Sequence, residues 1–234
     1  MHKFNFDEAY LPQIMNPMKS LFGRTAFSAL FFALILSSCT VEDEYTFNKD
    51  FTGKHVFKLT FEEYEGRNMG EMMIPKLAED KEGQEEAIRK MDSIPGVSNS
   101  YFTAEGTSLT MGYDFENLEV IGQPLTVMGK NSAASRNPAG GSAEDFIKRF
   151  EVKGNKIYIY EKEAESPDMG DTPAKMKEML ASISYTTVYR FAKKVKSVSD
   201  KRYIISDDKM SVGATFTGDD EDTKSDGKPL IIEF

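Results

Sequence analysis

Short stretches of alternating apolar and polar residues constrain the fold of this 234-residue chain more than any other feature. Side chains along a strand point to opposite faces in turn, so Phe57, Leu59 and Phe61 would share one face of a strand over residues 55–61. The same alternation predicts antiparallel strands in seven further stretches, of which two flank the turn-forming pair Gly154-Asn155 and predict a hairpin. These stretches are residues 97–104, 108–115, 149–153, 156–161, 185–191, 202–205 and 210–216, and residues 229–234 would supply a last strand.

Helical spacing of apolar residues interrupts the strands in two places. Residues 74–91 carry one apolar stripe, with Pro75 suited to the first helical turn and Gly83 dividing the segment into two short helices. Residues 172–183 carry a second stripe, and Asn117 would cap a short helical segment. The sequence therefore predicts an α+β fold, with a mostly antiparallel sheet and two main helices packed on it.

One domain is expected over residues 51–234. A loop rich in Asn, Ser, Ala and Gly covers residues 130–142 and is the best candidate for an internal boundary. The alternative is two β-rich halves that meet there, each crossed by a helix, although no residue-level repeat supports a duplication.

The segment before this domain has the organisation of an export signal. Lys19 and Arg24 precede an apolar run over residues 26–36, which is far shorter than the roughly 20 residues that a membrane-spanning helix needs. The pattern predicts a signal peptide over residues 1–38, with translation beginning at Met18.

The apolar run ends in Leu36, Ser37, Ser38 and Cys39, which resembles the lipobox of bacterial lipoproteins. The resemblance implies that a signal peptidase recognises Leu36, Ser37 and Ser38. It also implies that Cys39 becomes the mature N-terminus and carries diacylglycerol and a further acyl chain such as palmitate, which anchors the protein to a membrane. The alternative is a buried core cysteine that follows an ordinary signal peptide.

Residues 39–50 are expected to form a lipidated acidic tether. Within them Glu42, Asp43 and Glu44 resemble the signal that exports Bacteroidetes lipoproteins to the outer face of the outer membrane. A solvated tether without signalling content, with the protein facing the periplasm, is the alternative.

Composition excludes several kinds of chemistry. A formal charge of −9 argues against a nucleic-acid partner, because phosphate binding depends on clustered basic residues. Cys39 is the one cysteine and His55 the one histidine after the leader, so neither a Cys-His catalytic pair nor a Cys/His zinc site is available. A Ser-His-Asp triad would have to use His55, and no Gly-rich phosphate loop is present. No cofactor is expected.

Weaker site candidates lie elsewhere in the chain. Asp220, Asp222 and Asp226 offer oxygen ligands that calcium favours, but their spacing does not fit an EF-hand and favours a solvated loop. Ser93, within Asp92-Ser93-Ile94, resembles the O-glycosylation acceptor of Bacteroidetes envelope proteins.

Two residue clusters allow a functional and a structural interpretation. The basic cluster would meet an anionic partner or lipid headgroups, or would simply be solvated; its members are Lys193, Lys194, Lys196, Lys201 and Arg202. The methionines on the expected helices would line a gap for an apolar ligand, or would fill an ordinary core; they are Met69, Met72, Met73, Met91, Met176 and Met179.

Several segments of the mature chain resemble uncharacterised Bacteroidetes cell-envelope lipoproteins. They are Phe47 to Gly53, Tyr113 to Leu118, Phe191 to Asp200 and Ile205 to Lys209, and the chain departs from the pattern where Ala192 replaces an expected proline. The resemblance implies a compact α+β envelope domain and supplies no catalytic residues.

The leading hypothesis is a noncatalytic, lipid-anchored protein that binds a protein, glycan or small ligand at the cell surface. One alternative is a periplasm-facing carrier or chaperone for apolar molecules. A second alternative is a carboxylate-dependent hydrolase, which needs two facing acidic side chains in a cleft.

Overall fold

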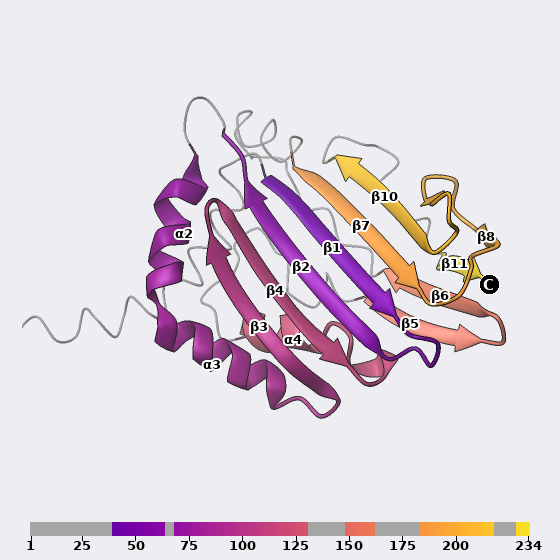
Figure 1. Ribbon diagram of the computed structural model, residues 1–234, viewed down its shortest axis with the longest axis horizontal. Helices are drawn as coiled ribbons and strands as arrows, with labels where there is room; N and C mark the ends of the chain where they lie inside the picture. Colours follow the sequence, from indigo (N-terminus) through magenta and orange to yellow (C-terminus); the bar gives the residue numbers. More distant parts are fainter. Residues whose placement is uncertain (1–38, 64–67, 131–147, 162–182, 218–227) are drawn as a thin grey trace, which may run out of the picture.

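The computed structural model describes residues 39–63, 68–130, 148–161, 183–217 and 228–234. This part of the chain contains three α-helices, one seven-stranded sheet and one four-stranded sheet. The prediction of an α+β fold is therefore confirmed. Figure 1 views the larger sheet face-on, with helices along one edge and the smaller sheet behind the opposite corner.

The large sheet has the strand order β3-β4-β2-β1-β7-β10-β9. Neighbouring strands are antiparallel except for β1 and β7, which are parallel. Because β1 pairs with β7, strands from both sides of residues 130–142 belong to one sheet. The strands are β1 (Cys39–Phe47), β2 (Gly53–Phe61), β3 (Val97–Glu105), β4 (Ser108–Phe115), β7 (Ser184–Phe191), β9 (Ile204–Ile205) and β10 (Ser211–Thr217).

The first strand corrects the prediction of a tether over residues 39–50, which is wrong for residues 39–47. These residues form β1, which pairs with β2 along its whole length, from Cys39 opposite Phe61 to Phe47 opposite Gly53. The acidic residues had masked the alternation of Val41, Tyr45 and Phe47 on the inner face of the sheet. β1 is central because β7 pairs along its other side.

The small sheet is antiparallel and has the order β5-β6-β11-β8. β5 (Lys148–Lys153) and β6 (Lys156–Glu161) form the predicted hairpin, and Gly154 supplies a φ of 62° at its turn. β11 (Leu230–Glu233) and the two-residue β8 (Ser197–Val198) complete the sheet; β8 had not been predicted.

The first helical segment is divided into α2 (Met69–Glu79) and α3 (Lys81–Asp92). The break falls at Asp80 rather than Gly83, because the Asp80 side chain accepts a hydrogen bond from the Gly83 N–H and so caps α3. The placement of Pro75 in the first turn is also wrong, since α2 begins six residues earlier.

Asn117 caps a short 3₁₀ helix (Leu118–Val120), as expected, by accepting from the Glu119 N–H. The following helix, α4 (Gln123–Lys130), was not predicted. The helix expected over residues 172–183 lies outside the described residues except for Ile183.

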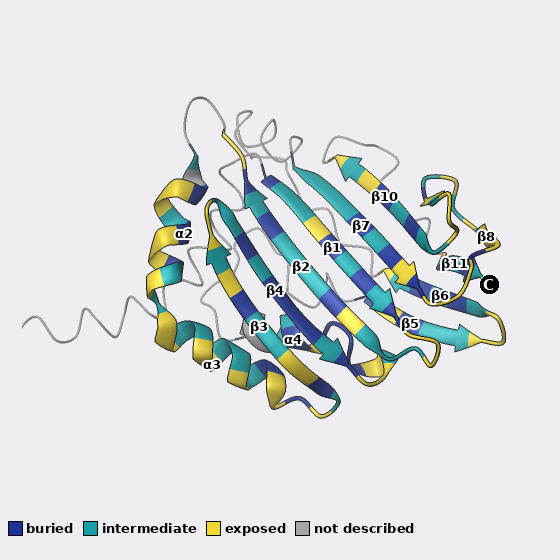
Figure 2. Cartoon of the chain, in the orientation of Figure 1, coloured by how far each residue is buried: buried dark blue, intermediate teal, exposed yellow. Residues whose placement is uncertain are grey.

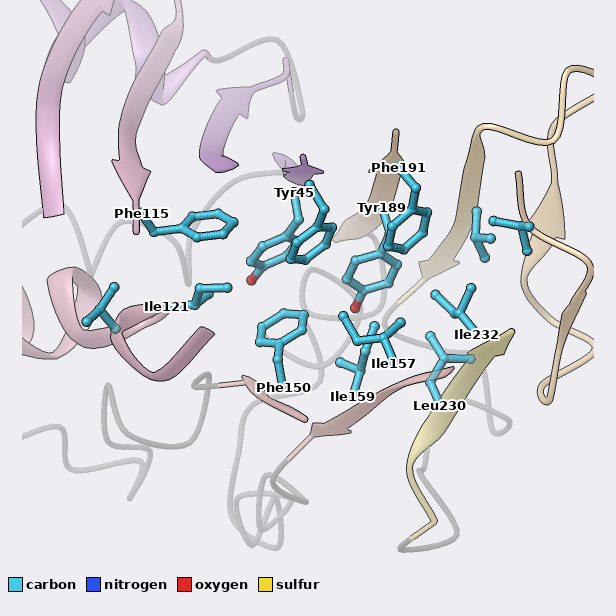
Figure 3. Packing of buried hydrophobic residues seen from close by; sticks show 14 of the residues in the cluster. Tyr45, Phe115, Ile121, Phe150, Ile157, Ile159, Tyr189, Phe191, Leu230 and Ile232 are labelled. Atoms are coloured by element: carbon cyan, nitrogen blue, oxygen red, sulfur yellow. The ribbon is translucent and has the colours of Figure 1, made fainter. Parts of the chain in front are cut away.

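The inner face of the large sheet carries two hydrophobic clusters. In the first, aromatic side chains of the large sheet meet Phe150, Ile157 and Ile159 of the small sheet (Figure 3). In the second, Ile74 and Leu77 of α2 and Met91 of α3 cover the other part of that face. Figure 2 shows that the buried positions of the large sheet alternate with less buried ones, as a sheet with one covered face requires.

Candidate functional site

Four buried polar or charged residues lie among the described residues, and they gather at one place between the two sheets. Asp43 of β1, His55 of β2 and Thr187 of β7 come from the large sheet, and Lys148 comes from β5 of the small sheet. We call these four residues the buried polar cluster. The pairing register explains their proximity, because Asp43 lies opposite Thr187, and His55 lies opposite Tyr45, two residues from Asp43.

Asp43 is the acceptor at the centre of the buried polar cluster. Its Oδ1 lies 2.5 Å from Nε2 of His55. Its Oδ2 accepts from Lys148 Nζ at 2.9 Å, and from the hydroxyls of Tyr45 at 3.0 Å and Tyr185 at 2.8 Å. Burial by itself would raise the pKa of this carboxyl, but the charge of Lys148 and the hydrogen bonds outweigh it and hold the pKa well below its usual range.

The hydrogen bonds of His55 engage both ring nitrogens. Tyr113 Oη accepts from the Gly122 N–H at 3.1 Å, so its own proton is available for Nδ1 of His55, 3.0 Å away. Nε2 then carries the ring proton and donates it to Asp43. In this tautomer every polar atom of the ring has a partner, and the ring is fully buried.

Lys148 supplies the positive charge that balances Asp43. Its Nζ also donates to Thr187 Oγ1 at 3.1 Å, and it lies 5.3–5.5 Å from the ring centroids of Tyr45, Tyr185 and Tyr189. Burial alone would lower the pKa of this lysine, but the Asp43 carboxylate raises it well above the ordinary value. The group is therefore a fixed cation and not a nucleophilic amine.

The charged groups of the buried polar cluster are engaged with other protein groups. The carboxylate, the imidazole and the ammonium each have protein partners, and the three residues are at most 6% exposed. The Lys148 ammonium also lies 3.6 Å from Oε1 of Glu161, a side chain that is 39% exposed, so it stands between Asp43 and a second carboxylate. The arrangement joins the small sheet to the large one through a hydrogen-bonded ion pair.

Sequence reasoning missed most of the buried polar cluster. It noticed His55 as the one histidine after the leader, but assigned Asp43 to an exposed signal and did not single out Lys148 or Thr187. The period-2 alternation of residues 39–47 was the one signal that would have placed Asp43 on an inward face.

Cys39 begins β1, and its side chain is 1% exposed in the second hydrophobic cluster, beside Leu59 and Phe61. Burial, together with the nearby charge of Glu62, raises the pKa of the thiol to about 11. In this fold the sulfur is protonated and shielded. The lipobox residues Leu36, Ser37 and Ser38 lie outside the described residues.

The three residues of the expected export signal do not share one surface. Glu42 pairs with Lys58 at 3.0 Å, and Glu44 makes two contacts with Arg190, at 2.8 and 3.2 Å. Asp43 points the opposite way, into the core. In the folded protein the acidic run is therefore divided between the two faces of β1.

The remaining candidates are dispersed. Ser93 is exposed after α3, where its hydroxyl donates to the Lys90 carbonyl at 2.7 Å. Asp220, Asp222 and Asp226 lie outside the described residues. Among the residues that are described, no cluster of His, Cys, Asp and Glu suits a metal ion.

The basic cluster is split between two places. Lys193, Lys194 and Lys196 follow the end of β7, whereas Arg202 pairs with Asp200 at 2.6 Å and stacks on Phe216. The split follows from the chain path, because β8 lies between the two groups.

The methionines whose side chains are described are divided between the core and the surface. Met91 is fully buried and Met73 packs partly against the same cluster, while Met72 is 63% exposed. The side chains of Met69, Met176 and Met179 lie outside the described residues.

Comparison with known proteins assigns this chain to no family. No protein-family model and no curated protein matches the sequence. The solved structure of the folded domain of LppM from Mycobacterium tuberculosis, determined by NMR, is similar, with a TM-score of 0.41 and 10% sequence identity over 84% of this chain and 88% of that one. At this distance the likeness carries no argument about function. None of the described helices is long and apolar enough to cross a membrane.

Proposed function

We propose that this chain is a lipid-anchored, noncatalytic protein of the cell envelope whose folded domain binds a partner at the cell surface. The observation that carries the proposal is the apolar leader ending in Leu36-Ser37-Ser38-Cys39, whose cysteine begins the first strand of the domain. Acyl chains on Cys39 would hold the domain at the membrane without a spanning helix.

Acylation requires a local change at the start of β1. A diacylglyceryl thioether is much larger than a thiol, so it cannot occupy the enclosed position of Cys39 beside Phe61. Release of Cys39 and Thr40 from β2 is sufficient, because the pairing continues from Val41 opposite Leu59 to Phe47 opposite Gly53. The anchored protein would keep the fold and lose three residue pairs of β1, which are Cys39 with Phe61 and Thr40 with Thr60 and with Ser184.

The buried polar cluster supports the noncatalytic part of the proposal. A catalytic acid, base or nucleophile must reach a substrate atom, and His55 and Lys148 have their polar atoms directed at protein partners inside the core. Their role in binding the two sheets together explains the cluster without a reaction.

Metabolic labelling with an alkyne analogue of palmitate tests the anchor. The wild-type chain, expressed in a bacterium that processes lipoproteins, should be labelled and should fractionate with membranes, and Cys39→Ala should lose both properties. Thr40→Ala is the matched control and should keep them. A chain that is unlabelled, with a thiol that reacts only after unfolding, would instead establish Cys39 as a buried core cysteine.

Surface export needs a separate test that does not alter the buried core of the domain. Glu42→Gln together with Glu44→Gln removes the two outward charges and leaves the buried Asp43 in place. Protease treatment of intact cells should degrade the wild-type protein, while the double variant should be protected. Equal degradation of both proteins would show that these residues do not direct export.

A further inference from the structure

Five exposed lysines lie at the end of the large sheet that is opposite Cys39. They are Lys49, Lys193, Lys194, Lys196 and Lys209. We call this surface the lysine end. The tips of β1 and β7 lie at the lower right of Figure 1, and four of these lysines follow those tips in the chain.

The backbone brings these lysines together. β1 and β7 run in parallel and finish side by side, with Phe47 opposite Phe191 and the Ala192 N–H donating to the Phe47 carbonyl. The chain beyond β7 then meets the turn before β10, where the Val195 N–H donates to the Lys209 carbonyl at 2.8 Å. The turn after β1 lies close as well, since Lys193 Nζ is 5.0 Å from the ring centroid of Phe51.

The lysine end carries more ammonium groups than there are carboxylates around it. None of its five lysines makes an ion pair within the described part of the chain. Four carboxylates lie nearby: Asp50 and Asp208 accept hydrogen bonds from hydroxyl groups and keep their charges, Asp207 is exposed, and Glu233 pairs with Lys156 and is also attracted by Lys196. The five lysines therefore outnumber these carboxylates by one. A local excess of positive charge in a chain of net charge −9 favours an anionic partner.

The position of the anchor argues against the membrane as that partner, a step that depends on the function proposed above. β1 has nine residues, so its far end lies about 27 Å from Cys39 along the strand. Acyl chains at Cys39 would therefore hold the lysine end away from the lipid headgroups.

The lysine end also lacks the large, exposed hydrophobic side chains that are typical of the centre of a protein interface. Among the described residues the exposed large hydrophobic side chains are Met72 and Ile204, and neither belongs to the lysine end. The rings of Phe51 and Phe234 lie beneath the Lys193 ammonium and are partly covered by it. Lysines on flexible stems, without an apolar centre, suit a polymer with charges spaced along its length.

We propose that the lysine end binds an anionic polysaccharide outside the cell. The ammonium groups of Lys193, Lys194 and Lys196 make the central contacts with its carboxylate or sulfate groups, and Lys49 and Lys209 make contacts at the edges. Binding of this kind is electrostatic and weakens as salt rises.

Polygalacturonate is a suitable probe, with neutral dextran as its control. The full chain is purified in mild detergent, so acylation of Cys39 does not affect the measurement and a failure of the anchor is distinguishable from a failure here. Isothermal titration should detect salt-sensitive binding of polygalacturonate and none of dextran. The triple variant Lys193→Gln, Lys194→Gln, Lys196→Gln should bind about tenfold more weakly, because three exposed ion pairs are lost.

The matched control is Lys76→Gln, Lys81→Gln, Arg89→Gln, which removes the same charge from exposed positions on α2 and α3. It should bind polygalacturonate like the wild-type chain. If both triple variants bound polygalacturonate equally weakly, the change in net charge alone would explain the loss of affinity, and the proposal would be wrong. Absence of polygalacturonate binding at low salt would also overturn the proposal. So would binding of phosphatidylglycerol vesicles that is as strong as polygalacturonate binding and depends on the same lysines. Circular dichroism checks that both variants are folded.

Discussion

The ammonium nitrogen of Lys148 lies 2.9 Å from Oδ2 of Asp43, a residue 105 positions earlier in the chain. The contact joins β5 of the small sheet to the central strand of the large sheet. The rings of Tyr45 and Tyr189, both labelled in Figure 3, stack from neighbouring strands at 5.4 Å. Lys148 Nζ lies 5.3 and 5.4 Å from their centroids, so the ion pair lies against an aromatic core. Each charge of the pair offsets part of the free energy that is needed to bury the other.

Removal of Lys148 should therefore strongly destabilise the protein. We expect Lys148→Met to lower the free energy of unfolding by about 3–5 kcal/mol, because Asp43 is left as a buried charge without its cation. Urea denaturation measures the change. Lys153→Met, at an exposed position of the same strand, should change it by less than about 1 kcal/mol.

A double variant separates the effect of losing the Lys148–Asp43 contact from the effect of burying an unpaired Asp43 carboxylate. Asp43→Asn combined with Lys148→Met should be more stable than Lys148→Met alone, because no uncompensated carboxylate remains. If Lys148→Met cost no more than the exposed control, the pair would not hold the sheets together.

Acid should destabilise the fold through Asp43. Its pKa is lower in the folded chain than the value near 3.9 in an unfolded chain, so the carboxylate contributes stability above about pH 4 and loses it as the pH falls further. We expect the urea midpoint to drop between about pH 4 and pH 2, and Asp43→Asn to reduce that drop. Parallel curves for the two proteins would contradict this assignment.

Two glycines of the large sheet should differ in their tolerance of a side chain. A Cβ at Gly53 would lie within 2 Å of the Thr46 carbonyl oxygen, which is backbone that cannot move without disturbing β1. A Cβ at Gly112 would instead meet the ring of Tyr101, whose far end can swing aside at the expense of its contact with Lys54. Thermal unfolding should show a loss of about 3 kcal/mol or more for Gly53→Ala and about 1 kcal/mol for Gly112→Ala. Equal losses would contradict this difference.

Local signals predicted the elements that local interactions stabilise. The hairpin around Gly154-Asn155 and the cap at Asn117 both depend on residues within a few positions of each other, and both are present. The break between α2 and α3 was misplaced by three residues because the capping carboxylate of Asp80 was overlooked, although that signal is also local.

By itself the sequence determined the alternating strands, the turns between them and the α+β class, because side-chain periodicity and turn chemistry act over a few residues. Only the tertiary structure decided that residues 39–47 form the central strand. An acidic stretch resembles a solvated segment until a cation is known to meet it, and for Asp43 that cation comes from Lys148, on a strand of another sheet. The same separation hid the buried polar cluster, since the burial of a charge depends on a partner that sequence neighbours do not reveal.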